Sequence, residues 1–423
     1  MLELGEDYEK KLVKRLDKNY CIIGSGVAAV YAAKAIRDQD KEANIHVFGA
    51  ENSLPYNRIK LSKDLYSDLH AEKVLIKKEK WYQDQNILVH VNTKIIDLDT
   101  EKHGITTASG EVFHYDKLLI CTGSQNRKLS IEGADLKGVY TIREMQEADD
   151  FKAFINDKQH VINIGGGIQG LETAWSIHKQ GKQVSIIEAA PRLMARQLDG
   201  KTSELLKKKI EAAGVQVYVN SSIESIKGEA AVEAIVVDNQ ELACDSVIYA
   251  IGVIPNLELV RNTDMAVNRG IIVNDRMQTN VEDIYAAGDV AEWNGEVAGL
   301  WNPAMDQGKV AGKNMAAPSP LTYQKSIPLT VFNAFDFALF SIGLVDENQC
   351  DTTIVEEDEE GKYTRVFIKD NKMVGVISLE GVVASLPYKA AIESEVSLAG
   401  IELNQVTVSE LMNELKKRQK LSA

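Results

Sequence analysis

The segment Asn19-Tyr-Cys-Ile-Ile-Gly-Ser-Gly-Val-Ala-Ala29 runs from an apolar strand pattern through a glycine turn into a helix of small residues. Its turn has the form G-x-G-x-x-A, which is typical of the first loop of a dinucleotide-binding βαβ unit. Gly24 permits the tight turn, Gly26 lets a pyrophosphate approach the backbone, and Ala29 keeps the helix close to the sheet. We expect the helix over 27–37 and the second strand over 44–48.

A second βαβ unit follows 141 residues after the first. An apolar run at 161–164 leads into Gly165-Gly-Gly167-Ile168-Gln-Gly170, a full G-x-G-x-x-G. A helix is then expected over 168–180 and a strand over 183–188. Two such units at this separation predict two nucleotide-binding domains rather than a solenoid repeat.

Each unit has an acidic residue where its second strand ends. Glu51 lies just past the first of these strands, and Glu188 ends the other, 18 residues after Gly170. A carboxylate at this position bonds ribose hydroxyls, and at Glu188 it would also repel the extra phosphate of NADPH. We therefore expect NADH rather than NADPH, with Arg192 as the nearby cation that could bind a phosphate instead. Two dinucleotide sites in one chain suggest FAD at the first unit and NADH at the second.

The remaining sequence divides around these units. Short strand patterns within 87–114 and 215–249 suit meanders on parallel sheets, so the expected fold class is α/β with two Rossmann-like domains. A linker is expected at 317–320, an antiparallel meander over 352–380, and a capping box at Thr407-Val-Ser-Glu410 that begins a terminal helix. The predicted parts are a helical extension at 1–18, a discontinuous FAD-binding domain at 19–120 and 244–317, an NAD-binding domain at 121–243, and a C-terminal α+β interface domain at 321–423.

The composition bears on partners and location. The chain of 423 residues has 48 Lys and Arg against 62 Asp and Glu, which gives a formal net charge of -14. This excess of acid disfavours non-specific binding to nucleic acid or to anionic lipid. No stretch approaches the ~20 apolar residues that span a bilayer, and the first ten residues lack a secretory pattern. We expect a cytoplasmic protein that binds neither nucleic acid nor membrane.

The cysteines and histidines show no spacing that predicts a redox pair or a metal site. Cys21, Cys121, Cys244 and Cys350 are 100, 123 and 106 residues apart, so no C-x-x-C pair exists. Three of them lie inside or beside buried strand patterns, where a free cysteine usually behaves as a small hydrophobic residue. The seven histidines form no pair at metal-ligand spacing. We predict that the protein binds no metal.

Three further motifs resemble those of a known family. T-N-V-E-D-I-Y-A-A-G-D at 279–289 looks like the second flavin motif of the pyridine nucleotide-dependent FAD reductases, and the resemblance implies that Asp289 binds the ribityl chain of the flavin. Cys121-Thr-Gly-Ser124 and Gly252-Val-Ile-Pro-Asn256 resemble the two crossover segments between the FAD and NAD domains of that family. Together the motifs follow the order of the family over 20–316.

The segment Leu54-Pro-Tyr-Asn-Arg-Ile-Lys-Leu-Ser-Lys63 selects a branch of the family. It is similar to the pattern L-P-Y-x-R-x-x-L-S-K of rubredoxin reductases, ferredoxin reductases, the flavin module of nitrite reductases and apoptosis-inducing factor. The resemblance implies that Arg58 contacts the FAD diphosphate, that Lys63 lies by flavin N5, and that Glu172 pairs with Lys63 where the nicotinamide stacks. A cation there would stabilise the negative charge that hydride arrival places on the flavin. The alternative for Glu172 is an ordinary glutamate on a helix surface.

The predicted site therefore combines two catalytic residues, Lys63 and Glu172, with a larger set of cofactor contacts. Trp301 matches the position where related ferredoxin reductases place a tryptophan against the flavin, and a core tryptophan is the alternative. Phe335-Asp-Phe-Ala-Leu-Phe-Ser-Ile-Gly343 looks closer to the rubredoxin reductase and nitrite reductase version of the third domain. The predicted cofactor contacts are Gly24, Gly26, Ala29, Glu51, Arg58, Lys63, Thr122, Gly123, Arg127, Gly165, Gly167, Ile168, Gly170, Glu188, Gly252, Asp289 and Trp301.

The resemblance implies an enzyme that passes hydride from NADH to N5 of FAD and then electrons, one at a time, to a small iron-containing carrier such as a rubredoxin. The lack of a cysteine pair supports this route, because electrons that cannot leave through a thiol leave the flavin directly. The alternatives are a hydrogen-peroxide-forming NADH oxidase, the NADH-oxidising subunit of a larger oxidoreductase, and a redox-sensing flavoprotein similar to apoptosis-inducing factor. We expect a monomer or a homodimer.

Overall fold

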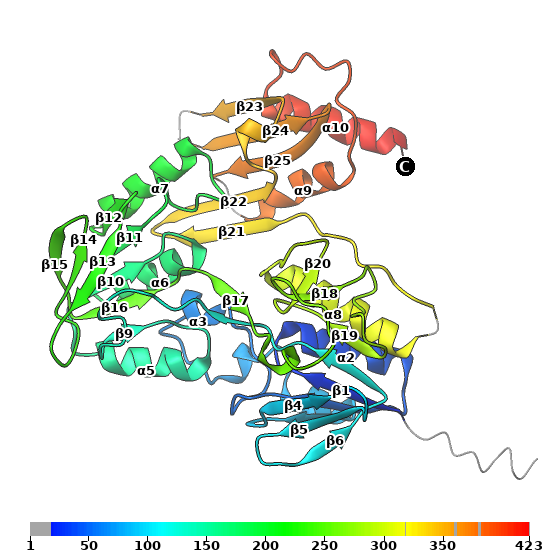
Figure 1. Ribbon diagram of the computed structural model, residues 1–423. Helices are drawn as coiled ribbons and strands as arrows, with labels where there is room; N and C mark the ends of the chain where they lie inside the picture. Colours follow the sequence, from blue (N-terminus) through cyan, green and yellow to red (C-terminus); the bar gives the residue numbers. More distant parts are fainter. Residues whose placement is uncertain (1–17, 318, 359–361, 380–381, 423) are drawn as a thin grey trace, which may run out of the picture. The chain divides into compact units, whose positions relative to one another are not determined.

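The computed structural model describes residues 18–317, 319–358, 362–379 and 382–422 (Figure 1). The helix predicted at 1–18 lies, apart from Lys18, outside the described residues. The chain divides into two compact units, each described here by itself. The first unit comprises Met1–Arg58, Asp68–Arg127 and Gly252–Ser326, and the second comprises Ile59–Ser67, Lys128–Ile251 and Ile327–Ala423.

A parallel five-stranded sheet forms the centre of the first unit, in the order β19-β7-β1-β2-β3. Because all neighbouring strands are parallel, their carboxyl ends share one edge of the sheet. Helix α2 (Val27–Gln39) joins the first two strands, as the glycine-turn pattern predicts. The strands are β1 (Asn19–Ile23), β2 (Asn44–Phe48), β3 (Ile87–His90), β7 (Lys117–Ile120) and β19 (Ile284–Ala286).

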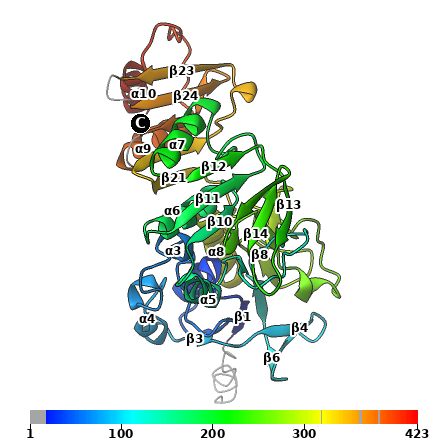
Figure 2. The same ribbon diagram turned by 90° about the vertical axis from the view of Figure 1, so that its left-hand side faces the viewer.

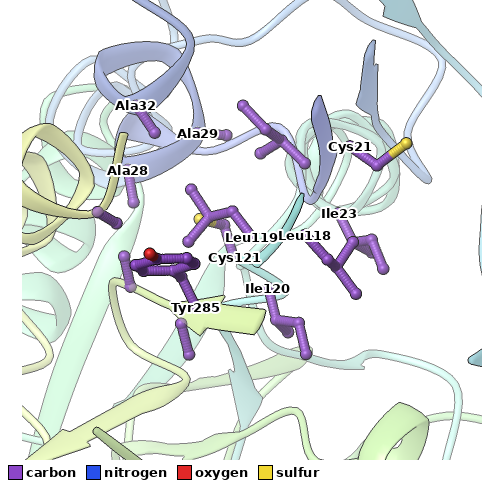
Figure 3. Packing of buried hydrophobic residues seen from close by; sticks show 14 of the residues in the cluster. Cys21, Ile23, Ala28, Ala29, Ala32, Leu118, Leu119, Ile120, Cys121 and Tyr285 are labelled. Carbon is purple, nitrogen blue, oxygen red and sulfur yellow. The ribbon is translucent and has the colours of Figure 1, made fainter. Parts of the chain in front are cut away.

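Small residues let two helices of the first unit pack closely. A Cβ atom on Gly308 of α8 (Trp301–Ala316) would lie 2.2 Å from the carbonyl oxygen of Ala28, and one on Gly312 would lie 2.3 Å from that of Ala32. Only hydrogen fits between these backbones, so α8 can contact α2 directly. Figure 3 shows Ala28, Ala29 and Ala32 of α2 within the same packed cluster as Leu119, Cys121 and Tyr285 of the sheet.

The other elements of the first unit are short. The antiparallel sheet β4-β5-β6 is one of the meanders that the strand patterns predict. The bounds are β4 (Ile95–Asp99), β5 (Gly104–Thr107), β6 (Val112–His114), β8 (Ser124–Asn126), β17 (Val253–Pro255), β18 (Ile271–Val273), β20 (Ala291–Trp293), α4 (Glu79–Asp84), η1 (Glu72–Val74) and η2 (Glu258–Val260).

The second unit contains a matching parallel sheet in the order β12-β11-β10-β16-β9 (Figure 2). A three-stranded antiparallel sheet, β13-β14-β15, is the second predicted meander. The strands are β9 (Val139–Tyr140), β10 (His160–Ile164), β11 (Gln183–Glu188), β12 (Gln216–Val219), β13 (Ile223–Lys227), β14 (Ala234–Val237), β15 (Gln240–Ala243) and β16 (Ser246–Tyr249). The helices are α3 (Lys60–Lys63), α5 (Met145–Ile155), α6 (Ile168–His178) and α7 (Gly200–Ala212).

The second unit also contains the antiparallel sheet β21-β22-β25-β24-β23 (Figure 1). The predicted capping box is present, because Thr407 and Glu410 exchange hydrogen bonds at the start of α10. Leu411 and Leu415 of that helix are buried in the core that the sheet forms. The elements are β21 (Leu329–Ala334), β22 (Phe337–Gly343), β23 (Thr352–Glu357), β24 (Tyr363–Lys369), β25 (Lys372–Ser378), α9 (Ser385–Glu393), α10 (Val408–Ser422), η3 (Glu347–Gln349) and η4 (Val382–Ala384).

Several helix boundaries differ from the prediction. Helix α2 ends at Gln39, two residues beyond the predicted end at 37. Helix α6 ends at His178, two residues before the predicted end, and Gly181 then adopts a φ of +78°. The sequence before the Ala-Pro-Ser-Pro linker predicts a helix over 305–316, whereas α8 begins four residues earlier, at Trp301. Pro303 is compatible with this earlier start, because backbone N–H groups in the first turn of a helix have no partner within it. None of the helices in the described ranges is long and apolar enough to cross a membrane.

The close contact of α2 with α8 predicts the effect of adding one methyl group. Gly308→Ala should lower the free energy of unfolding by about 1–3 kcal/mol, because its Cβ would collide with the backbone at Ala28. Gly200→Ala in α7 is the matched control, since a Cβ there meets no atom within 4 Å and an alanine in a helix is favourable. Thermal unfolding should show a lower Tm for the first variant alone. Equal Tm values for the two variants would contradict this packing.

Candidate cofactor sites

The first glycine turn has the backbone geometry that a diphosphate requires. Gly24 has a φ of +115°, and a Cβ atom there would lie 2.1 Å from the carbonyl oxygen of Cys121. A Cβ on Gly26 would meet no atom within 4 Å, so the space in front of the helix is open. Gly26 is also the N-cap of α2, and no side chain caps this helix. The N–H groups at the helix start can therefore bind an anion, and the turn fits the diphosphate of FAD.

The predicted flavin residues share one edge of the first sheet. Gly24 follows β1, Glu51 follows β2, Thr122 follows β7, and Asp289 follows β19. Ligands of open parallel sheets bind outside this edge, so the topology brings together the residues that the motifs single out. The Ser124 hydroxyl donates to Asp289 Oδ2 at 2.8 Å and fixes the carboxylate. The individual contacts of these residues with FAD stay predictions.

Glu51 and Arg58 lie together, with Tyr56 between them. The Tyr56 hydroxyl donates to Glu51 Oε2 at 2.6 Å, and Arg58 Nη1 donates to the Tyr56 oxygen at 2.9 Å. Arg58 also forms an ion pair with the Glu51 carboxylate. The charge of Glu51 is therefore compensated before any ribose binds, and each carboxylate oxygen keeps lone pairs for further donors. Tyr56 belongs to the matched segment at 54–63, but the pattern does not predict this linking role.

The two predicted crossover segments pair with each other. Strands β8 and β17 are antiparallel, with Ser124 opposite Pro255. The Thr122 hydroxyl donates to the carbonyl of Asn256 at 3.1 Å, and the Asn256 amide returns a bond to the carbonyl of Thr122 at 2.8 Å. The N–H of Asn256 donates to the carbonyl of Gly123 at 3.0 Å. The N–H of Arg127 donates to the carbonyl of Gly252 at 2.9 Å, so the four predicted residues of these segments lie in one ladder.

Trp301 is the first residue of α8 and packs partly against the hydrophobic core of the first unit. Part of the Trp301 side chain is therefore buried against the core, which is consistent with the alternative that it is a core tryptophan. Ala29 is fully buried in α2, where it contributes to the helix contact with the sheet.

The second glycine turn repeats the geometry of the first. Gly165 has a φ of +112°, and its Cβ would lie 2.4 Å from the carbonyl oxygen of Ala250. A Cβ on Gly167 would meet no atom within 4 Å, whereas one on Gly170 would lie 2.1 Å from the Gly165 carbonyl. Ile168 begins α6 immediately after the turn. The open helix start fits a second dinucleotide diphosphate.

Glu188 closes this turn from the neighbouring strand. Its Oε2 accepts from the N–H of Gly166 and its Oε1 from the N–H of Ala190, both at 2.6 Å. Arg192 points its donors elsewhere, at the carbonyls of Ala195 at 3.1 Å and Leu198 at 3.3 Å. The cation that could bind the extra phosphate of NADPH is therefore held within its own loop, which favours the expected choice of NADH.

Lys63 and Glu172 are brought together as the resemblance implies, although the contact is long. Lys63 Nζ lies 3.9 Å from Glu172 Oε1, and the side chains are 41% and 6% exposed. The Ser62 hydroxyl lies 3.4 Å from Glu172 Oε2, and the Ser176 hydroxyl donates to the Ser62 carbonyl at 3.0 Å. These contacts hold α3 against α6. Glu172 is thus buried rather than on the helix surface. Ser62 lies in the matched segment at 54–63, but the pattern does not predict its contact with Glu172, and Ser176 belongs to none of the quoted motifs.

The environment of Glu172 disfavours its charge. Burial raises the pKa of Glu172 to about 6 from an ordinary 4.5, and the Lys63 ammonium and the Ser62 hydroxyl oppose this only in part. The Lys63 ammonium is too exposed and too distant for its attraction to offset the loss of hydration of the Glu172 carboxylate. The Glu172 carboxyl group, with a pKa of about 6, therefore lies next to the exposed ammonium of Lys63.

All four cysteines are free and lie in the described part of the chain. Burial raises the pKa of Cys21 and of Cys244 to about 12 and also raises the pKa of Cys121 and of Cys350. A thiol with so high a pKa holds little of the thiolate that redox exchange requires at neutral pH. Cysteine chemistry is therefore disfavoured in both units.

The raised pKa of Glu172 predicts how pH affects stability. Because the folded protein holds this proton more tightly than the unfolded chain, the penalty of ionising Glu172 is absent below pH 4.5 and complete above pH 6. Raising the pKa from 4.5 to about 6 corresponds to a loss of about 2 kcal/mol in the free energy of unfolding at neutral pH. Glu172→Gln should therefore gain stability over the wild type by this amount as the pH rises from 4.5 to 7, measured by unfolding at each pH. The reverse trend would mean that Lys63 dominates the carboxyl.

The chain is similar to known proteins along most of its length. Residues 18–308 match the family described as pyridine nucleotide-disulphide oxidoreductase, and residues 328–396 match the rubredoxin NAD+ reductase C-terminal domain. The NAD(P)H nitrite reductase of Bacillus subtilis (strain 168) is 35% identical over 85% of this chain and 45% of that protein. The NADH-rubredoxin oxidoreductase of Clostridium acetobutylicum is 33% identical over 90% of this chain and 96% of that protein. The chain thus spans less than half of the nitrite reductase.

A solved structure agrees with these matches. The ferredoxin reductase of Rhodopseudomonas palustris is 26% identical and has a TM-score of 0.85 over 94% of this chain and 99% of that chain. The predicted α/β fold, the oxidoreductase class and the FAD and NADH cofactors are confirmed at the level of the family. The chain belongs to the pyridine nucleotide-disulphide oxidoreductase family, and its C-terminal part is a rubredoxin NAD+ reductase C-terminal domain.

Proposed function

We propose that this protein is an NADH-dependent flavoprotein reductase that delivers electrons to a small iron-containing carrier of the rubredoxin type. The observation that carries the proposal is the position of Lys63 beside Glu172. Glu172 lies on α6, the helix that begins at the second glycine turn. Two relatives bear the names NADH-rubredoxin oxidoreductase and rubredoxin-NAD(+) reductase, at 33% and 34% identity.

FAD, when bound, accepts a hydride at N5 and releases its electrons singly. The protein supplies binding and charge for this chemistry. The first glycine turn and Arg58 would hold the FAD diphosphate, and the second turn with Glu188 would hold NADH. The Lys63 ammonium would stabilise the negative charge that develops on the ring, and Glu172 would hold that ammonium in position. The partial exposure of Lys63 leaves it free to reorient, while Glu172 is fixed by its burial.

The cysteines favour direct exit of the electrons. A disulfide relay needs two neighbouring thiols, one of them with a low pKa, and the buried thiols of this chain have raised pKa values. Reducing equivalents would therefore pass from the flavin to an external acceptor, as an iron carrier requires.

A second candidate is the NADH-oxidising part of a larger oxidoreductase. It is favoured by the nitrite reductase relative, of which this chain spans 45%. In that case the acceptor would be another subunit, and the chain would purify together with it. The monomeric or homodimeric state, the cytoplasmic location and the division into three domains stay predictions.

The two halves of the proposed reaction can be tested separately by anaerobic stopped-flow absorbance. NADH should bleach the flavin faster than NADPH, because Glu188 opposes the extra phosphate and Arg192 is engaged elsewhere. The reduced protein should then reduce a rubredoxin faster than it reduces oxygen. A flavin that NADH does not bleach would refute the reductase, whereas faster transfer to oxygen would refute the carrier and favour an oxidase.

The role of the cation can be tested on one short helix. Lys63→Met should slow flavin reduction at saturating NADH by about 10²–10³-fold, the usual loss on removing one stabilising donor from a developing charge. Lys60→Met is the matched control, since Lys60 lies on the same helix and pairs with Asp64 at 3.0 Å. The limiting rate of the control should equal that of the wild type. An equal loss in both variants would assign the effect to the fold of α3.

A further inference from the structure

Asp199 is a buried carboxylate whose two oxygens serve two different parts of the second unit. Only 5% of the residue is exposed. Its Oδ1 accepts from the N–H of Thr202 at 2.8 Å, which caps the start of α7. Its Oδ2 accepts from Arg365 Nη1 at 2.9 Å and from the Tyr363 hydroxyl at 3.1 Å. Both donors belong to β24 of the C-terminal sheet, and α7 lies beside that sheet in Figures 1 and 2.

Asp199 directly follows a loop that forms one side of the second glycine turn. This adenosine loop comprises residues 189–198 and starts after Glu188. The N–H of Met194 donates to the carbonyl of Gly166 at 2.9 Å, which ties the loop to the turn. The hydroxyl of Ser203, in the first turn of α7, donates to the carbonyl of Leu193 at 2.9 Å. The start of α7 therefore fixes the loop at both its middle and its end.

The C-terminal sheet presents Arg365 in a fixed position. Arg365 Nη2 donates to the Glu347 carboxylate and, at 3.2 Å, to the hydroxyl of Thr353. The guanidinium also lies 5.2 Å from the centre of the Phe367 ring. Since β24 has neighbours on both sides in its sheet, this cation has little freedom to follow Asp199 if the loop moves.

The contact is energetically strong because it is buried. Burial would raise the pKa of Asp199, but the bonds from Thr202, Arg365 and Tyr363 together lower it below its ordinary value. The side chains of Asp199 and Arg365 are 4% and 16% exposed. Removing Arg365 would leave a buried charge without a cation, held only by the N–H of Thr202 and the Tyr363 hydroxyl, and such a charge is stabilised by moving towards water. That movement would displace the end of the adenosine loop.

We propose that Arg365 and Tyr363 of the C-terminal sheet are positioning residues for NADH: by binding Asp199, they hold the adenosine loop in the conformation that receives the adenosine half of the dinucleotide. This inference rests on the proposed function, in which the second glycine turn binds NADH. It gives the C-terminal domain a part in substrate binding in addition to its expected role as an interface.

The experiment uses the FAD-loaded protein and measures flavin reduction as a function of NADH concentration by stopped flow. Arg365→Met should raise the half-saturating NADH concentration about tenfold, within the range of coupling in one polar network. The limiting rate should not change, because Lys63 and Glu172 are untouched. Asp199→Asn keeps an oxygen that can cap α7 but loses the charge, so it should behave like Arg365→Met. ADP-ribose, which lacks the nicotinamide, should lose inhibitory strength in parallel.

Two further variants separate positioning from general stability. Tyr363→Phe removes one hydrogen bond and should raise the half-saturating concentration about threefold, even if Arg365→Met does not fold. Glu357→Gln removes the exposed ion pair between Lys201 of α7 and Glu357 of β23, at 2.6 Å, which joins α7 to the neighbouring strand of the same sheet at the surface. This matched control should leave both kinetic constants unchanged.

The possible results separate this inference from the proposed function. If NADH does not reduce the wild-type flavin, the proposed function fails. If NADH reduces the wild type but the half-saturating concentration stays within about twofold in Arg365→Met, Asp199→Asn and Tyr363→Phe, the positioning role is overturned, whatever happens to Tm. A lower limiting rate with an unchanged half-saturating concentration overturns it as well.

Discussion

The two candidate dinucleotide sites, one in each unit, depend on the same steric constraint. A Cβ atom on Gly24 would lie 2.1 Å from the carbonyl oxygen of Cys121, and one on Gly165 would lie 2.4 Å from that of Ala250. Each of these carbonyls follows a neighbouring strand of the sheet. Only glycine permits this approach, and both residues have φ values near +110°. The turn can therefore be tight enough for the next helix to start at the edge of the sheet. Its N–H groups then face the space where a diphosphate would bind.

Lys63 and Glu172, the proposed catalytic pair, differ in how far each is buried. Glu172 is fixed by its place on α6 and by Ser62, whereas Lys63 keeps 41% of its side chain in contact with solvent. A fully buried ion pair would have to recover a large cost of lost hydration and would be rigid. Here the loss of hydration destabilises the charged form of the buried Glu172 and so raises its pKa. In the proposed function, the exposed end of the Lys63 side chain can adjust its position to the flavin ring.

The sequence predicts the parts of the fold that local patterns determine. The turns, β2, β11 and the start of both helices follow from the spacing of glycine and apolar residues, because close packing in βαβ units leaves little choice there. The position after the second strand indicates Glu51 and the family resemblance indicates Arg58, but their ion pair and their shared contact with Tyr56 depend on how the loop after β2 folds. Ser62 lies in a recognised segment and Ser176 does not, but the contact of either serine could not be predicted, since it depends on the packing of α3 against α6. Asp199 and Arg365 are separated by 166 residues, so no local pattern could join them.

The Asp199 contact joins two segments of the second unit that are far apart in the sequence. A carboxylate that only capped α7 would need no more than the N–H of Thr202, and asparagine or serine would serve as well at an N-cap. Burying a charge there is unfavourable unless a cation compensates it, and Arg365 is that cation. Arg365 falls inside the matched rubredoxin NAD+ reductase C-terminal domain, at 328–396. The conformation of the loop after Glu188 therefore cannot be independent of the C-terminal sheet, since the same carboxylate satisfies both.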